Sequence, residues 1–295
     1  MKAPQASVHY RAEILSAGLP PLLVAAERVA STVSQGVHGR RRVGQGETFW
    51  QFRRYQPGDS TQLIDWRESA KSQHVYVRET EWEAAQSVWL WRDGSPSMDY
   101  RSGRDRPTKR ERAELLLLAL TSLLIRGGER VTLLGAGEAP RSGRAALNRI
   151  AIAVDDGTAD GASLPGFEPV PRYGRVVLIG DLLSPLDELK AAVGAYAGRG
   201  VRGHLLQILD PAEETFPFTG RIQFEGVEDE GEVLLGRVES VRDDYHAALE
   251  AHQLGLVELA RRAGWTFATH RTDRAPETAL MALYIALSEG PSWRV

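Results

Sequence analysis

Strands and helices alternate along the chain from about residue 85 to the C-terminus, and this alternation constrains the fold more than any other feature. Several of the expected strands are continuous apolar runs: SVWLWRD, GRVVLIG and GHLLQILD at residues 87–93, 174–180 and 203–210. Such runs are typical of strands that are covered on both faces. The helical segment RAELLLLALTSLLIRGG, residues 112–128, ends in two glycines that favour a helix stop. The pattern predicts an α/β fold with a doubly wound, mostly parallel sheet flanked by helices.

Two segments depart from this alternation. The first 84 residues predict a helix at about residues 21–34, followed by a β and loop extension that includes the strand-like HVYVRET, residues 74–80. The segment GRIQFEGVEDEGEVLLG, residues 220–236, predicts a small β-hairpin insertion. We therefore expect an N-terminal extension of residues 1–84 and a sheet domain of residues 85–295.

Composition excludes several classes of protein. The chain has no cysteine, which excludes disulfides, thiolate catalysis and cysteine-bound zinc. The net charge of −3 provides no strong general attraction to nucleic acid. The longest apolar run, LLLLALTSLLI at residues 115–125, is shorter than the roughly 20 residues that a membrane span needs and predicts a buried helix. Because the N-terminus also lacks an apolar segment of the signal-peptide kind, we expect a cytoplasmic protein that makes no membrane contact.

Two aspartates follow strands of the predicted sheet. Asp93 comes directly after the first apolar strand, and Asp181 comes directly after the strand at residues 174–180. In open α/β sheets, ligands bind beyond the carboxyl ends of the strands, so both carboxylates are expected at one rim. The turn after Asp93 adds the hydroxyls of Ser95 and Ser97, and these hard oxygens suit Mg²⁺ or Mn²⁺. A capped turn before a helix would explain the same Asp-x-Ser-x-Ser string without a metal.

This string resembles the metal-ion-dependent adhesion site (MIDAS) of von Willebrand factor A domains. That pattern continues with a later threonine and a later aspartate, which Thr158, in DDGTADGAS, and Asp181, in LIGDLLSP, resemble. The resemblance implies a von Willebrand factor A-like domain in which Asp93, Ser95, Ser97, Thr158 and Asp181 bind Mg²⁺ or Mn²⁺. It also implies that one metal position stays open for an Asp or Glu of a protein partner, so that the site performs ligation and no bond is broken.

The N-terminal segment carries a second resemblance. The stretch FRRYQPGDSTQLIDWRESAKSQHVYVRETEWE, residues 52–83, is similar to the hallmark of the bacterial family called domain of unknown function fifty-eight. Members of that family are typically encoded beside MoxR-type AAA+ ATPases. The resemblance implies an adaptor or chaperone-like partner of such an ATPase, or of its client, in the assembly or maturation of protein complexes.

Two other functions start from the same residues. A metal-dependent phosphoester hydrolase also begins with an aspartate and Mg²⁺ at a strand end. However, the chain has no Asp-x-Asp pair at Asp93 and no Gly-x-x-x-x-Gly-Lys, His-Glu-x-x-His or Gly-x-Ser-x-Gly motif, so we expect no enzyme. Turnover of a phosphoester that requires Asp93 would reverse this ranking.

The second alternative is nucleic-acid binding by arginines interleaved with aromatic residues: Arg40, Arg41, Arg42, Arg53 and Arg54 with Phe49, Trp50, Phe52 and Tyr55. We favour a structural role, in which these arginines pair with acids such as Asp59, Asp65 and Glu79. The tripeptide Asp65-Trp66-Arg67 is likewise expected to fix the extension, with the Trp66 ring buried.

Overall fold

The computed structural model describes residues 26, 29, 30, 33, 43–56, 61–81, 85–157, 161–226 and 231–288. The chain divides into two compact units, a small unit of residues 35–85 and a larger unit that combines residues 86–295 with residues 1–34. Each unit has its own secondary structure and is described by itself.

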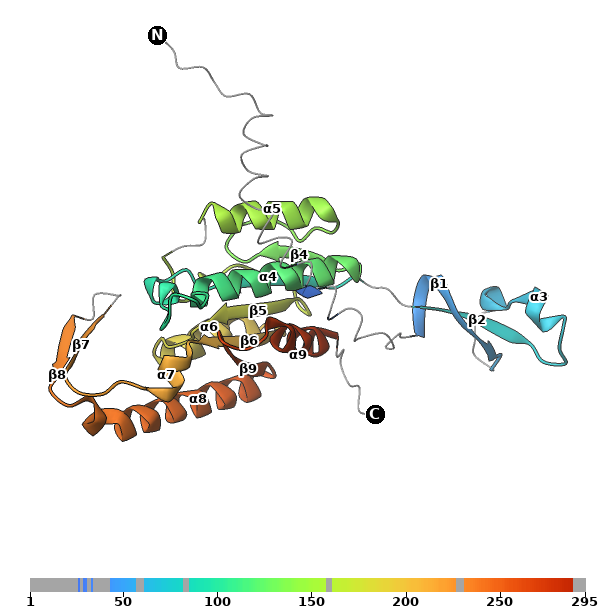
Figure 1. The fold of residues 1–295 in the computed structure, drawn as a ribbon. Helices are drawn as coiled ribbons and strands as arrows, with labels where there is room; N and C mark the ends of the chain where they lie inside the picture. The colour runs from blue at the N-terminus through green and yellow to red at the C-terminus, as the bar shows by residue number, and fades with distance from the viewer. Residues whose placement is uncertain are drawn as a thin grey trace, which may run out of the picture. The chain divides into compact units, whose positions relative to one another are not determined.

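The larger unit is built on a five-stranded sheet in which every neighbouring pair of strands is parallel (Figure 1). The strands are β3 (Ser87–Arg92), β4 (Arg130–Leu133), β5 (Arg175–Gly180), β6 (Arg202–Leu209) and β9 (Thr266–Arg271). Their spatial order is β4-β3-β5-β6-β9, so the chain moves outward from β3 to β4 and then returns to the other side of β3. This reversal between β3 and β5 is the topological switch point of a doubly wound sheet. The predicted α/β fold is therefore confirmed.

Helices cover the sheet and contact one another in two groups (Figure 1). They are α4 (Lys109–Arg126), α5 (Arg144–Asp155), α6 (Leu186–Ala197), α8 (Arg242–Ala263) and α9 (Pro276–Ser288). Helix α4 packs against α5 and α9, whereas α6 packs against α8. Helix α5 was not among the elements predicted from the sequence, although its buried positions follow a helical period: Ala146, Leu147, Ile150, Ala151 and Val154.

The hydrophobic core lies between the sheet and the helices that cover it. Trp89 and Trp91 of β3 are buried in one cluster with Leu189 of α6 and Leu256 of α8. Six leucines of the α4 run are buried as predicted: Leu116, Leu117, Leu118, Leu120, Leu123 and Leu124. The helix ends at Arg126 with Gly127 as its C-cap. Of the predicted helix at residues 21–34, the structure describes four helical, buried residues with the spacing of one helix face: Ala26, Val29, Ala30 and Val33.

The small unit is an antiparallel pair of strands, β1 (Val43–Arg54) and β2 (Tyr76–Glu81), with the short helical turns η1 (Thr61–Leu63) and α3 (Trp66–Ser69) between them. The strand predicted at residues 74–80 is confirmed as β2.

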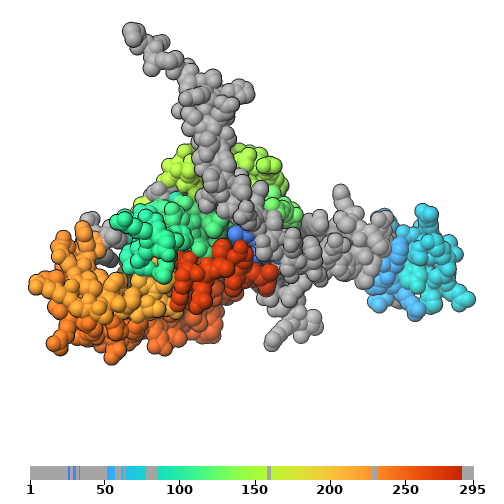
Figure 2. Space-filling view, in the orientation of Figure 1, coloured from blue at the N-terminus to red at the C-terminus, as the bar shows by residue number. Residues whose placement is uncertain are grey.

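The segment between β6 and α8 carries the predicted hairpin. It contains α7 (Pro211–Thr215), the antiparallel strands β7 (Ile222–Glu225) and β8 (Glu232–Leu235), and the turn η3 (Val238–Val241). In the space-filling view, this orange segment lies at one end of the larger unit (Figure 2). Among the helices that the structure describes, none combines the length and the apolar character required to cross a membrane.

Candidate functional site

The switch point brings the two predicted aspartates to one rim of the sheet. The backbone N–H of Asp93, directly after β3, donates to the carbonyl of Ile179 in β5 at 2.8 Å. The next residue, Gly94, donates to the carbonyl of Ala162 at 3.0 Å and accepts from the N–H of Gly161 at 2.8 Å. These bonds fix the exit of β3 against β5 and against the loop that follows α5.

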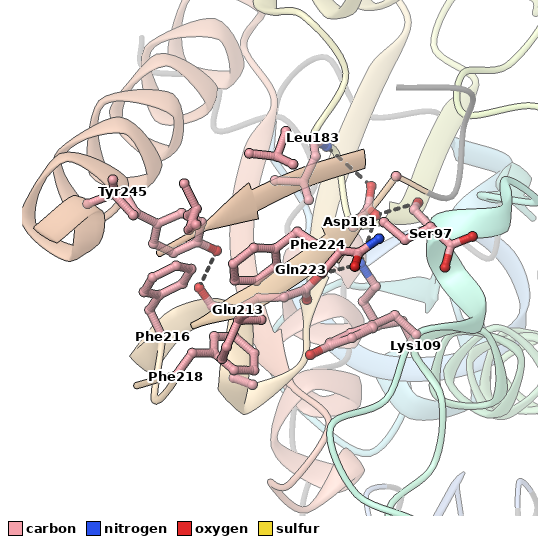
Figure 3. A pocket seen from close by; sticks show the side chains of 18 of the residues that line it. Ser97, Lys109, Asp181, Leu183, Glu213, Phe216, Phe218, Gln223, Phe224 and Tyr245 are labelled. Carbon is pink, nitrogen blue, oxygen red and sulfur yellow. Dashed lines mark hydrogen bonds and ion pairs between the residues drawn. The ribbon is translucent and has the colours of Figure 1, made fainter. Parts of the chain in front are cut away.

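Four predicted side chains form a chain of hydrogen-bonded oxygen atoms at this rim. The Ser95 hydroxyl donates to Asp93 Oδ1 at 2.5 Å, and the Ser95 backbone N–H donates to the same oxygen at 2.8 Å. The hydroxyls of Ser95 and Ser97 lie 3.0 Å apart. Ser97 donates to Asp181 Oδ2 at 2.7 Å (Figure 3). Asp93, Ser95 and Asp181 are buried, while Ser97, in the turn η2 (Pro96–Asp99), is partly exposed. The structure therefore brings these four residues together, and Thr158 lies outside the described residues.

The spacing of these oxygens is that of ordinary hydrogen bonds, and it is also compatible with the ligand spacing around a magnesium ion. Mg²⁺ binds oxygens at about 2.0–2.1 Å in octahedral geometry, so neighbouring ligands lie about 3 Å apart. The successive separations of 2.5, 3.0 and 2.7 Å are close to that edge length. Within the described ranges, no three histidine, aspartate or glutamate side chains converge on a metal position. An ion at this rim would therefore be held by serine hydroxyls as well as by the two carboxylates.

Lys109 adds a charge that the sequence analysis missed. Its ammonium Nζ lies 2.9 Å from Asp181 Oδ2 and 2.6 Å from Glu213 Oε1, and the side chain is only 1% exposed (Figure 3). Lys109 is the first residue of α4, where Thr108 and Glu111 form a capping box. The start of this helix thus directs a cation at the second aspartate of the oxygen chain.

Burial and pairing oppose one another in this ion-pair triad. Burial by itself would lower the pKa of Lys109, but the charges of Asp181 and Glu213 outweigh burial and leave that pKa above its usual value. Burial raises the pKa of Glu213, and the Lys109 ammonium only partly opposes this rise. The ammonium is therefore held charged between its two partners.

The turn after β5 holds Asp181 in place. The N–H of Leu183 donates to Asp181 Oδ1 at 3.2 Å, and Gln207 Nε2 donates to the Asp181 carbonyl at 2.9 Å. Leu182 has a left-handed backbone with φ of 52°, a conformation that costs free energy for a residue with a side chain. His252 of α8 donates to the Leu182 carbonyl at 2.7 Å, so the strained turn is tied to the helix behind it.

The small unit gives a different result for Trp66. Asp65 caps α3 by accepting from the N–H of Glu68 at 2.9 Å, which agrees with a structural role for that aspartate. Trp66, however, is 68% exposed, so the prediction that its ring is buried was wrong. Arg40, Arg41, Arg42 and Asp59 lie outside the described residues, so the nucleic-acid alternative stays a prediction.

Comparisons with known proteins agree with the resemblance of the N-terminal segment. A family model described as "Protein of unknown function DUF58" matches residues 51–255. The chain is 27% identical over 276 residues to Uncharacterized protein Mb1516 of Mycobacterium bovis, covering 88% of this chain and 86% of that protein. Uncharacterized protein Rv1480 of Mycobacterium tuberculosis matches with the same identity and coverage.

Two solved structures are similar to this chain. Conserved hypothetical protein BatB from Bacteroides thetaiotaomicron has 15% identity and a TM-score of 0.39, covering 70% of this chain and 100% of that one. An aerotolerance-related membrane protein from Bacteroides fragilis has 17% identity and a TM-score of 0.40, covering 69% of this chain and 98% of that one. The family assignment rests on the model match, which spans residues 51–255 and therefore more than half of the chain. This chain belongs to the DUF58 family.

Proposed function

We propose that this chain is a divalent-metal-dependent protein-interaction module. The observation that carries the proposal is the chain of oxygens from Asp93 through Ser95 and Ser97 to Asp181, which lies at the switch point of the sheet. Hydroxyl and carboxylate oxygens at about 3 Å spacing are a donor set for Mg²⁺ or Mn²⁺.

The chemistry of the site is binding, without bond breaking. The two carboxylates and two hydroxyls would hold the ion, and the bound ion would supply a positive charge with a ligand position open to a carboxylate of a partner protein. Asp93 is fully buried, so it would bind the ion from the protein interior. Ser97 is the most exposed of the four ligands, so it would lie on the solvent side, where the partner approaches. The Leu183 and Gln207 bonds to Asp181 keep the second carboxylate oriented.

The partner that we propose is a MoxR-type AAA+ ATPase or its client, and the role is that of an adaptor or chaperone-like protein in the assembly of protein complexes. Support for this comes from membership of the DUF58 family together with the resemblance of Asp93-Gly-Ser-Pro-Ser97 to the adhesion-type site. The two protein carboxylates balance the formal charge of the ion, so a partner carboxylate would be drawn by the coordination position that stays open.

Substitution of Asp93 tests the proposal. Asp93→Ala removes the first oxygen ligand, so Mn²⁺ binding measured by titration calorimetry should be lost. Capture of an AAA+ ATPase from lysate of the native cells, identified by mass spectrometry, should then fail in Mg²⁺, just as capture by the parent chain should fail in EDTA. Asp187→Ala is the matched control, because Asp187 lies on α6 with a side chain that is 92% exposed.

Circular dichroism should report the same secondary structure for both variants. Partner capture that persists unchanged in EDTA, or Mn²⁺ binding that survives Asp93→Ala, would count decisively against a metal-dependent interaction at this rim.

A further inference from the structure

A pocket of about 1140 Å³ opens directly beside the oxygen chain. One end is formed by Ser97, Lys109 and Asp181 (Figure 3). The other end is formed by the aromatic side chains of Phe216, Phe218, Phe224 and Tyr245. The volume slightly exceeds the roughly 300–1000 Å³ of small-molecule pockets, which suits several consecutive side chains of a peptide.

The far end of the pocket is a packed aromatic wall. Phe216 stacks on Tyr245 with ring centroids 4.3 Å apart and on Phe224 at 5.9 Å, and Phe218 meets Phe224 edge to face at 5.5 Å. The Tyr245 hydroxyl donates to the Glu213 carbonyl at 2.5 Å, which ties the wall to the triad around Lys109. Rings held by one another in this way present a preformed apolar surface.

The hairpin extends this apolar surface toward solvent. Its cross-strand pairs Ile222–Leu235 and Phe224–Val233 line the pocket, and Val233 is 54% exposed. Apolar side chains on a two-stranded hairpin have little protein to pack against, so a partner that covers them gains buried area.

The polar lining of the pocket is acidic. Among the described residues, five carboxylates and one base line it, and that base is Lys109, which is already paired with Asp181 and Glu213. The other three, Glu188, Glu225 and Asp244, are exposed. Glu225 also lies directly opposite Glu232 in the hairpin, a pairing of like charges that is unfavourable until a cation approaches. The exposed carboxylates of the pocket lining therefore favour a basic group.

We propose that this pocket binds a short segment of the partner protein that places one large apolar side chain on the aromatic wall and a lysine or arginine at Glu188, Glu225 and Asp244. The proposal rests on the proposed function and deepens it, because the apolar and basic side chains would flank the carboxylate that binds the metal. Arginine and lysine also bind favourably to the faces of aromatic rings, which the wall provides. The partner's carboxylate would bind the metal. The aromatic wall and the exposed carboxylates of the pocket would then select segments that carry an apolar and a basic side chain beside that carboxylate.

Selection from a random dodecapeptide library displayed on phage, against the immobilised full chain in Mg²⁺, tests this inference. Enriched peptides should share a large apolar residue within about three positions of a lysine or arginine. Synthetic fluorescent versions are then titrated by anisotropy against the parent and its variants. Val233→Ser and Glu225→Lys should each weaken binding at least tenfold while Mn²⁺ affinity stays unchanged, because neither residue belongs to the oxygen chain.

Two controls share the chemistry of these positions but lie outside the pocket. Leu254→Ser and Glu250→Lys change an exposed leucine and an exposed glutamate of α8, and both should bind the peptides as the parent does. Phe224→Ala gives a stronger test once circular dichroism shows that the variant is folded.

The outcomes separate this inference from the proposed function. Peptide binding that depends on Mg²⁺ and Asp93 but is insensitive to Val233→Ser and Glu225→Lys would overturn the pocket and keep the metal-dependent interaction. Binding that responds to the pocket variants but not to EDTA or Asp93→Ala would keep the pocket and overturn the metal-dependent interaction. No enrichment, or enrichment of peptides without the apolar and basic pair, would overturn the inference.

Discussion

Lys109 is the residue that most changes the chemistry of the oxygen chain. Its ammonium touches the same Asp181 oxygen that accepts from Ser97, so it competes with a divalent ion for that carboxylate. A unit charge about 4 Å from another contributes about 4 kcal/mol near a protein surface. We expect Lys109→Met to tighten Mg²⁺ binding at least about tenfold, or about 1.4 kcal/mol, in a calorimetric titration. Without metal, the same variant should lose about 3–5 kcal/mol of unfolding free energy, because Asp181 and Glu213 lose their buried counter-charge.

The opposite substitution in the triad supplies the control. Glu213→Gln removes the second negative charge beside the ammonium, so Lys109 is left with Asp181 as its charged partner. Mg²⁺ binding should then weaken relative to the parent. If both variants shift the affinity in the same direction, Lys109 does not compete with the ion.

At the scale of elements, the site depends on how closely β5 approaches the exit of β3. A Cβ atom on Gly180, the last residue of β5, would lie 2.6 Å from the Asp93 Cβ and 2.9 Å from its Oδ2. Gly180→Ala must therefore displace Asp93, and we expect a stability loss of about 1–3 kcal/mol in urea unfolding. The affinity of this variant for Mg²⁺ should also fall at least tenfold, because Asp93 is displaced from the oxygen chain.

Gly203 on the neighbouring strand β6 gives a matched control for Gly180. Its added Cβ would lie 2.5 Å from the Trp265 ring, away from the oxygen chain. Gly203→Ala should thus be destabilised to a similar degree while it binds Mg²⁺ as the parent does. Equal losses of Mg²⁺ affinity in the two variants would show that overpacking acts through general destabilisation.

The elements also show what a sequence can and cannot predict. The apolar runs of β3 and β5 end at Asp93 and Asp181, so strand ends and two ligands were visible from local pattern alone. Lys109 lies 72 residues from Asp181 and 104 residues from Glu213, and no local pattern reports a contact over such distances. The pocket was hidden for the same reason, because its lining joins Ser97, Lys109 and Asp181 to residues 212–245. Trp66 failed differently, since hydrophobicity by itself does not fix which way a short helix faces.

For the larger unit as a whole, two buried histidines make stability depend on pH. Burial lowers the pKa of His204 in β6 to about 4, with a smaller effect of Arg175, and it lowers the pKa of His270 in β9 to about 4, with Arg112 contributing. His204 is hydrogen-bonded to Thr266, and His270 lies 3.3 Å from a nitrogen of Arg112. Both imidazole rings are therefore neutral in the folded protein at neutral pH.

The sign of the pH effect follows from these depressed pKa values. Between about pH 6.5 and pH 4 the unfolded chain binds protons that the folded chain does not, so stability is full above about 6.5 and falls as the pH drops toward 4. Lowering a pKa from 6.5 to about 4 corresponds to about 3 kcal/mol for each histidine. Urea unfolding followed by tryptophan fluorescence should show this loss in the parent, and the double variant His204→Gln and His270→Gln should show a much flatter profile. An equally steep profile in the double variant would assign the acid sensitivity to the carboxylates around Lys109 instead.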